Sequence, residues 1–123
     1  MAATKRAARR TGVAPVTAIA MIVAAYPRRA AAVKAARALV RAGALACATV
    51  APGATAFYRW EGKFQETASV LLWGKTTRSR ASRALKAIAA LHPDRVPEIL
   101  VLPCSNAHPA YAAWVAASTK GKR

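Results

Sequence analysis

Apolar residues along the chain follow two periods, and their order predicts seven elements. Residues 16–25 form an apolar run with the spacing of a strand. Residues 27–42 and 77–91 repeat apolar residues every three or four positions, as amphipathic helices do. Two longer strand-like runs, 47–60 and 64–76, meet at a turn. A short apolar run at 99–102, typical of a strand buried on both faces, and a short helix at 109–117 complete the series.

Proline, glycine and hydroxyl residues mark the boundaries of these elements. Pro27 suits the first turn of a helix, and Pro52-Gly53 predicts a bulge within the second strand. Thr77 and Ser79 carry hydroxyls that can cap the second main helix. His92-Pro93 ends that helix, because the residue before a proline resists helical geometry.

The helical spacing also predicts which side of each helix is buried. In the first helix the predicted stripe consists of Val33, Ala36 and Val40, with Leu39 beside it. In the second helix the predicted stripe consists of Ala81, Ala84, Leu85, Ile88 and Leu91.

The order β-α-β-β-α-β-α predicts an α+β fold of the ferredoxin-like type in one domain, residues 13–118. Right-handed crossovers place both main helices on one face of the sheet. Strands one, three and four are apolar on both sides, so the other face would expose more apolar surface than a monomer normally shows. Self-association is the expected remedy. The last helix is an alternative cover, but it is too short to cover the whole face.

The charge of the chain is strongly positive. The chain of 123 residues contains twenty Lys and Arg residues and only four acids, which gives a formal net charge of +16. Such a charge attracts polyanions, for example nucleic acid, an acidic membrane surface or an acidic partner. A solvated basic exterior is the alternative. Because aromatic residues are not interleaved with the basic residues of the helices, any nucleic-acid binding is expected to be electrostatic and non-specific.

Motifs for catalysis are missing from the sequence. It has no paired carboxylates of the glycosidase kind, no G-x-S-x-G, no Walker loop and no G-x-G-x-x-G. Cys47 and Cys104 lie 57 residues apart without a C-x-x-C pair, which argues against a zinc site or a disulfide framework. We therefore expect a non-enzymatic protein with reduced thiols in the cytoplasm.

The N-terminus allows two interpretations. Basic residues precede the apolar run 13–25, as in a signal peptide, and an acid-free, Arg-rich start also suits a transit peptide. The run is too short for a membrane span and ends in Tyr26-Pro27-Arg28, a poor cleavage site. We favour a flexible basic tail, residues 1–12, followed by the first strand. A second basic tail, residues 119–123, closes the chain.

Several sequence blocks occur together in a family-specific order. ACAT, PGAT, YRWEGK, KTT, HP and VPEILVLP follow one another between residues 46 and 103. In these blocks and their spacing the chain resembles the CutA family of divalent-cation-tolerance proteins. The resemblance implies a homotrimer of ferredoxin-like subunits, similar to PII signal proteins in fold and trimer geometry. It also implies a non-enzymatic role in the response to divalent metal ions.

The resemblance raises the question of copper(II). The family is described as binding it through a cysteine of the first strand and a histidine pair closing the second helix. Here the cysteine position is Ala24, and the histidine pair falls on Leu91 and His92. His92 and Cys47 are the candidate soft ligands for copper(II) or another divalent cation. The alternative is that His92 merely ends a helix and Cys47 fills the core.

A small-anion pocket is a second candidate site. The similarity to PII proteins implies clefts between subunits near strand ends, where Lys75, Glu98, Trp60 and His92 occur. Lysine and histidine can hold a phosphate or a carboxylate, as in a nucleotide sensor. The alternative is a structural ion pair between Lys75 and Glu98.

Overall fold

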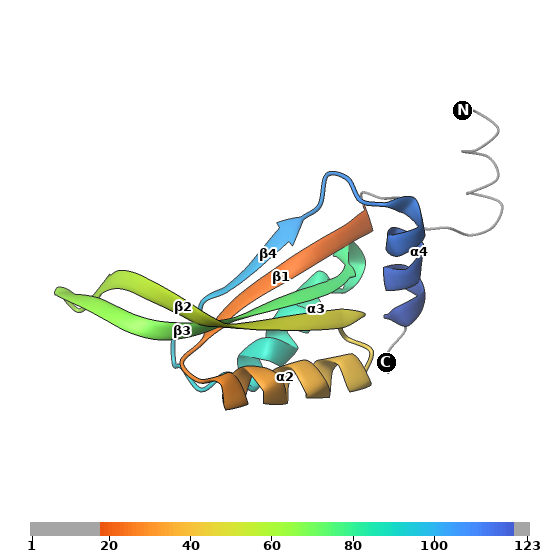
Figure 1. The fold of residues 1–123 in the computed structure, drawn as a ribbon. Coiled ribbons are helices and arrows are strands. Elements are labelled where there is room, and N and C mark those ends of the chain that lie inside the picture. Colours follow the sequence, from red (N-terminus) through yellow and green to blue (C-terminus); the bar gives the residue numbers. More distant parts are fainter. Residues whose placement is uncertain (1–17, 120–123) are drawn as a thin grey trace, which may run out of the picture.

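The structure, a computed structural model, describes residues 18–119. Its elements follow the predicted order (Figure 1): β1 Ile19–Tyr26, α2 Arg29–Arg41, β2 Cys47–Trp60, β3 Lys63–Thr77, α3 Arg78–Ala90, β4 Ile99–Pro103 and α4 Pro109–Ser118. The proposed tail at 1–12, the predicted strand start at Val16 and residues 120–123 lie outside the described residues. Thr119, assigned to the second tail, is instead the buried C-cap of α4.

The four strands form one antiparallel sheet in the order β2-β3-β1-β4. Helices α2 and α3 pack on the same face of this sheet, while α4 stands across one end (Figure 1). This arrangement confirms the predicted α+β ferredoxin-like fold.

Strands β2 and β3 form an arm that extends beyond the rest of the sheet (Figure 1). Trp60 pairs with Lys63, and the two turn residues between them, Glu61 and Gly62, both have positive φ angles, 51° and 78°. That is the hairpin turn whose twist matches the strands. The register shifts between Ala51 and Ala54, which confirms the predicted bulge at Pro52-Gly53.

The main core lies between the sheet and the two helices. β1 contributes Ile22, Ala24 and Tyr26 from alternate positions. The buried stripe of α2 is Ala32, Ala35 and Leu39, so the predicted stripe of Val33, Ala36 and Val40 is wrong by one residue. Both stripes have helical spacing; the structure places the small alanines against the sheet, where they let the helix approach closely, and leaves Val40 37% exposed.

Helix α3 follows its prediction more closely. Ala81, Ala84 and Ile88 are buried, whereas Leu91 is the C-cap residue and is 38% exposed. The predicted hydroxyl cap is wrong: the Thr77 side chain makes no cap hydrogen bond with the helix backbone. Its hydroxyl lies 3.2 Å from the hydroxyl of Ser79 instead. The first helix also begins later than predicted, at Arg29 rather than at Pro27.

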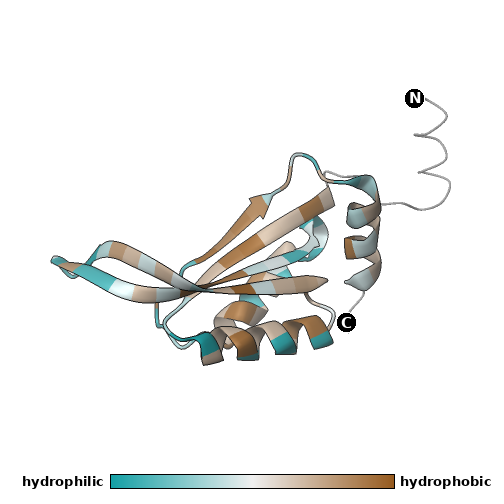
Figure 2. Ribbon diagram, in the orientation of Figure 1, coloured by the Kyte–Doolittle hydropathy of each residue, from teal (hydrophilic) through white to brown (hydrophobic). Residues whose placement is uncertain are grey.

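The second face of the sheet is apolar and largely uncovered within one subunit. Its residues, called the open face below, are neighbours across β3, β1 and β4: Met21, Val23, Leu71, Trp73, Leu100 and Leu102. Figure 2 shows the apolar residues of β1 and β4 as brown segments. Helix α4 covers only one end, through Ala112 and Val115 against Ile19. The prediction that β4 is buried on both faces is wrong for a single subunit, because β4 is an edge strand whose Leu100 is 56% exposed.

Candidate functional site

His92 connects the end of α3 to the end of β1. Its Nδ1 accepts a hydrogen bond from the Asp94 backbone N–H at 3.1 Å, so the ring proton resides on Nε2. That nitrogen donates to the Ala25 carbonyl oxygen at 2.6 Å. The ring stacks on Tyr26 with centroids 4.3 Å apart. Both ring nitrogens of the neutral imidazole are therefore already in use.

Tyr26, the ring partner of His92, is 1% exposed. Its hydroxyl has no hydrogen-bond partner among the described residues. Burial disfavours the ionised phenolate and raises the pKa of Tyr26 from 10.0 to about 12. An unpaired polar group in this position lowers stability, since it loses water without gaining a partner.

This shifted pKa predicts a specific loss of stability in alkali. The folded protein holds the Tyr26 proton more tightly than the unfolded chain does. The contribution of this proton to the free energy of unfolding is therefore complete below pH 10 and is lost as the pH rises to about 12. We expect Tyr26→Phe to lose less unfolding free energy than the parent over this interval, by roughly 2 kcal/mol. Denaturant unfolding at pH 9, 10, 11 and 12 measures it.

Tyr58→Phe is the matched control for this series, because Tyr58 lies on the arm and is 44% exposed. Its stability curve should run parallel to that of the parent protein. A Tyr26→Phe curve that also runs parallel to the parent would contradict the assignment.

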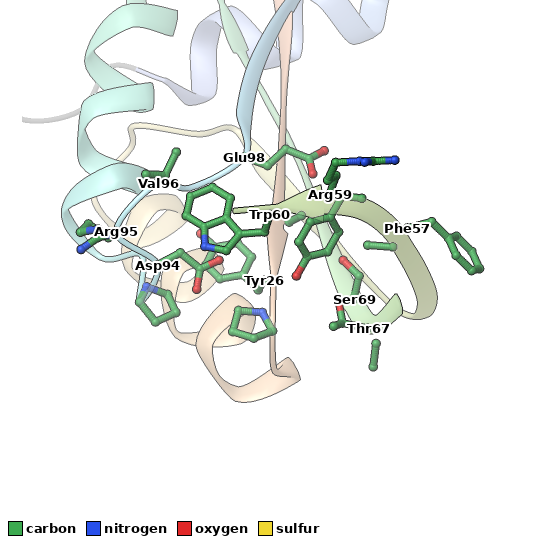
Figure 3. A pocket seen from close by; sticks show the side chains of 16 residues that line it. Tyr26, Phe57, Arg59, Trp60, Thr67, Ser69, Asp94, Arg95, Val96 and Glu98 are labelled. Atoms are coloured by element: carbon green, nitrogen blue, oxygen red, sulfur yellow. The ribbon is translucent and has the colours of Figure 1, made fainter. Parts of the chain in front are cut away.

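A groove of about 830 Å³ lies between the arm and the loop after α3 (Figure 3). Two predicted residues, Trp60 and Glu98, line it, together with Asp94 and the arginines Arg59 and Arg95. Glu98 reaches this end of the sheet because its carbonyl oxygen accepts from the Ala25 N–H at 3.1 Å. The two carboxylates offset the charges of Arg59 and Arg95, so the wall of the groove has no excess positive charge to attract a bare anion.

Lys75 lies elsewhere and does not line this groove. It pairs in register with Cys47 and Met21, whereas the groove begins at Ala25, four residues further along β1. Its Nζ donates to the Thr49 hydroxyl at 3.0 Å. The structure therefore separates Lys75 from Trp60 and Glu98, and it shows no ion pair between Lys75 and Glu98.

Cys47 lies at the same end of the sheet as Lys75. Its Sγ is 3.3 Å from the Tyr111 hydroxyl of α4. The pKa of Tyr111 is raised to about 12, first by burial and then by its hydrogen bond to Cys47 and by the charges that Cys47 and Cys104 can carry. Both cysteines are free and half-buried.

The candidate metal ligands do not fit a copper centre within one subunit. Cys47 shares a row of the sheet with Met21, whereas His92 bonds to Ala25, so about 13 Å of strand separates these rows. Ala24 is fully buried and offers no ligand. Between residues 18 and 119 no three His, Cys, Asp or Glu side chains form a group able to hold a metal ion. Copper(II) prefers several nitrogen or sulfur ligands in a tetragonal set.

Sequence reasoning missed three contacts at these sites. Tyr26 as the stacking partner of His92 and Tyr111 as the partner of Cys47 depend on distant packing, and nothing local signals them. The third contact is made by His108, which precedes α4. It is exposed, but it also caps α4, and its Nδ1 accepts from the Ala110 N–H at 3.1 Å. Because the helix start at Pro109 was predicted, the position of His108 immediately before it could have suggested this capping role.

Comparison with known protein families shows to which family this chain belongs. Residues 20–118 match the family model described as CutA1 divalent ion tolerance protein. The chain belongs to the CutA1 family. Relatives named divalent-cation tolerance protein CutA, from Escherichia coli O139:H28 and Shigella boydii serotype 18, are each 41% identical over 75 residues. The matched part is 61% of this chain and 67% of each relative.

Solved structures of the CutA1 family have the same fold. CutA from Xylella fastidiosa is similar with a TM-score of 0.81 and 32% identity, over 84% of this chain and 99% of that one. The divalent cation tolerance protein CutA1 from Thermus thermophilus gives 0.78 and 34%, over 82% and 98%. The family is named for tolerance of divalent ions and not for a catalysed reaction. Within residues 18–119 no helix is long and apolar enough to cross a membrane.

Proposed function

We propose that this CutA1 protein acts in divalent-cation tolerance as a non-enzymatic homotrimer. The observation that carries the proposal is the match to the CutA1 model over nearly the whole described chain. The homotrimer rests on the open face, because a soluble protein rarely leaves so large a contiguous apolar surface in water. Further copies of the chain can bury that surface.

The open face has the composition of an interface core. Trp73 on β3 is 43% exposed, and Leu100 and Leu102 on the edge strand β4, on the other side of β1, are 56% and 41% exposed. These are large apolar side chains, as in the core of permanent assemblies, and the charged residue Lys75, which pairs with Met21, borders them on the same face. The arm extends beyond the rest of the sheet (Figure 1), and we propose that it contacts a second subunit.

The metal response, in our proposal, does not use a copper centre built within one subunit. His92 has no free ring nitrogen, and Cys47 lies at the other end of the sheet. Free, half-buried thiols at Cys47 and Cys104 suit a reducing compartment, so we place the protein in the cytoplasm.

A growth assay tests the proposed function. We expect expression of this chain to restore growth at toxic copper(II) or zinc(II) in a bacterial strain whose own CutA gene has been deleted. A variant that cannot assemble, Trp73→Glu, should restore less. Unchanged metal sensitivity despite abundant folded protein would contradict a role in tolerance.

A further inference from the structure

The outer side of the two main helices carries positive charge without any negative charge. We call this surface the helix face. It consists of nine basic residues: Arg28, Arg29, Lys34, Arg37, Arg41, Arg78, Arg80, Arg83 and Lys86. Eight of them are exposed and Arg80 is half-buried. Neither α2 nor α3 contains an acid, and hydrophilic residues recur along α2 in Figure 2.

The four acids of the chain all lie elsewhere. Glu61 and Glu66 are on the arm, and Asp94 and Glu98 line the groove beside it. The arm itself is close to neutral, because its acids offset Arg59 and Lys63. The charge of the described chain is therefore segregated and not spread over the surface. A net charge needed only for solubility does not require such a pattern.

The basic residues of the helix face also lower the stability of α2 and α3. Arg28 and Arg29 flank the start of α2, and Arg78 and Arg80 lie in the first turn of α3. Positive charge is unfavourable at a helix N-terminus, where the macrodipole is already positive. Arg37 and Arg41 add a like-charge pair at i and i+4. An anion bound along this face would relieve all of these repulsions.

The geometry of the helix face suits an extended partner. β1 and β3 are antiparallel, and each helix returns along the strand before it, so α2 and α3 run antiparallel beside each other. The exposed basic residues therefore follow two rows, one on each helix. Seven of the nine are arginines, whose planar guanidinium binds phosphate through two parallel hydrogen bonds.

The helix face lacks aromatic side chains, and this indicates which kind of polyanion it can bind. The exposed aromatic residues of the described chain lie on the arm, the open face and α4, and none lies on α2 or α3. Single strands stack their bases on aromatic side chains, and membrane-surface helices insert large apolar ones. The two helices offer no exposed aromatic residue, and their single exposed large apolar residue, Val40 at 37%, is too little apolar surface to anchor a helix in a membrane. A duplex, which presents a regular row of phosphates with its bases already stacked, needs only cations.

We propose that the helix face binds double-stranded nucleic acid through its phosphates, without reading the sequence. The helices cover the side of the sheet opposite to the open face, so this inference is independent of the proposed function and compatible with the trimer. A trimer would present the surface three times.

Fluorescence anisotropy with a labelled 24-base-pair DNA duplex tests the inference over 50 to 300 mM NaCl. We expect binding at 50 mM that weakens linearly with log salt and is equal for two unrelated sequences. Arg37→Glu with Arg83→Glu should lower the affinity more than tenfold and reduce the salt slope by about two. Both substitutions add acids that favour their helices, so folding is maintained.

The matched control reverses the same number of charges on the arm, by Arg59→Glu with Lys63→Glu. It should keep most of the affinity. Equal losses in the two variants would overturn the helix face as the site, because net charge alone would then explain binding. No binding at 50 mM NaCl would overturn duplex binding altogether. Stronger binding to a single strand of the same length, or to phosphatidylserine vesicles at equal charge concentration, would also overturn it.

Discussion

Trp73→Glu is expected to convert the assembled protein into single subunits. Trp73 lies on the β3 side of the open face, directly opposite Val23 of β1 and Thr49 of β2. In an assembled interface its carboxylate would be buried without a partner, which costs several kcal/mol. Within a single subunit the position is 43% exposed, so the new charge remains in water and the fold survives. Sedimentation velocity at micromolar concentration measures the change.

Val40→Glu is the control for this substitution. Val40 is a large apolar residue of similar exposure, 37%, but it lies on α2, away from the open face. Its sedimentation should match that of the parent protein. If Trp73→Glu also sedimented like the parent, the open face could not be the assembly surface. Circular dichroism of both variants establishes that the subunit fold is intact.

His92→Ala is expected to lower the stability of the fold and to leave copper binding unchanged. The substitution removes the hydrogen bond to the Ala25 carbonyl, the acceptor for the Asp94 N–H and the stack on Tyr26. Together these contacts are worth on the order of 2 kcal/mol. Copper binding should not change, because no ring nitrogen of His92 is available to a metal ion. Thermal unfolding and copper(II) titration calorimetry measure the two quantities.

His108→Ala serves as the control, because His108 is the other histidine of the chain and its side chain bonds to the start of α4, away from His92. Loss of this cap should cost about 1 kcal/mol or less, and its copper titration should also match the parent. The opposite pattern for His92→Ala, a stable protein that has lost its copper heat, would identify His92 as a ligand and contradict the structural role.

The arrangement of the fold could be predicted because punctuation and hydrophobic period agree along the chain. Pro52-Gly53 marks the bulge, Glu61-Gly62 marks the hairpin turn, and His92-Pro93 marks the end of α3. The register of α2 could not be predicted in the same way. Alanines and valines both recur with helical spacing there, and only the fit against the sheet selects Ala32 and Ala35.

The candidate site was harder to predict, for reasons that differ between residues. Trp60 ends β2, and Lys75 lies near the end of β3. Two strands joined by a hairpin run antiparallel, so their last residues lie at opposite ends of the sheet. Their separation therefore follows from the predicted topology and could have been deduced. The bonds of His92 could not, since its main partner is a backbone carbonyl 67 residues away with no side-chain signature. The basic residues of the helix face, and the position of all four acids outside both predicted helices, were visible in the sequence.

Native mass spectrometry of the purified protein tests the central claim most directly. The uncovered apolar side of the sheet predicts self-association, and the relationship to the CutA family sets the expected assembly at three copies, each of 12.9 kDa, at low micromolar concentration. A spectrum dominated by single 12.9 kDa chains, from protein that remains folded and in solution, would contradict the account.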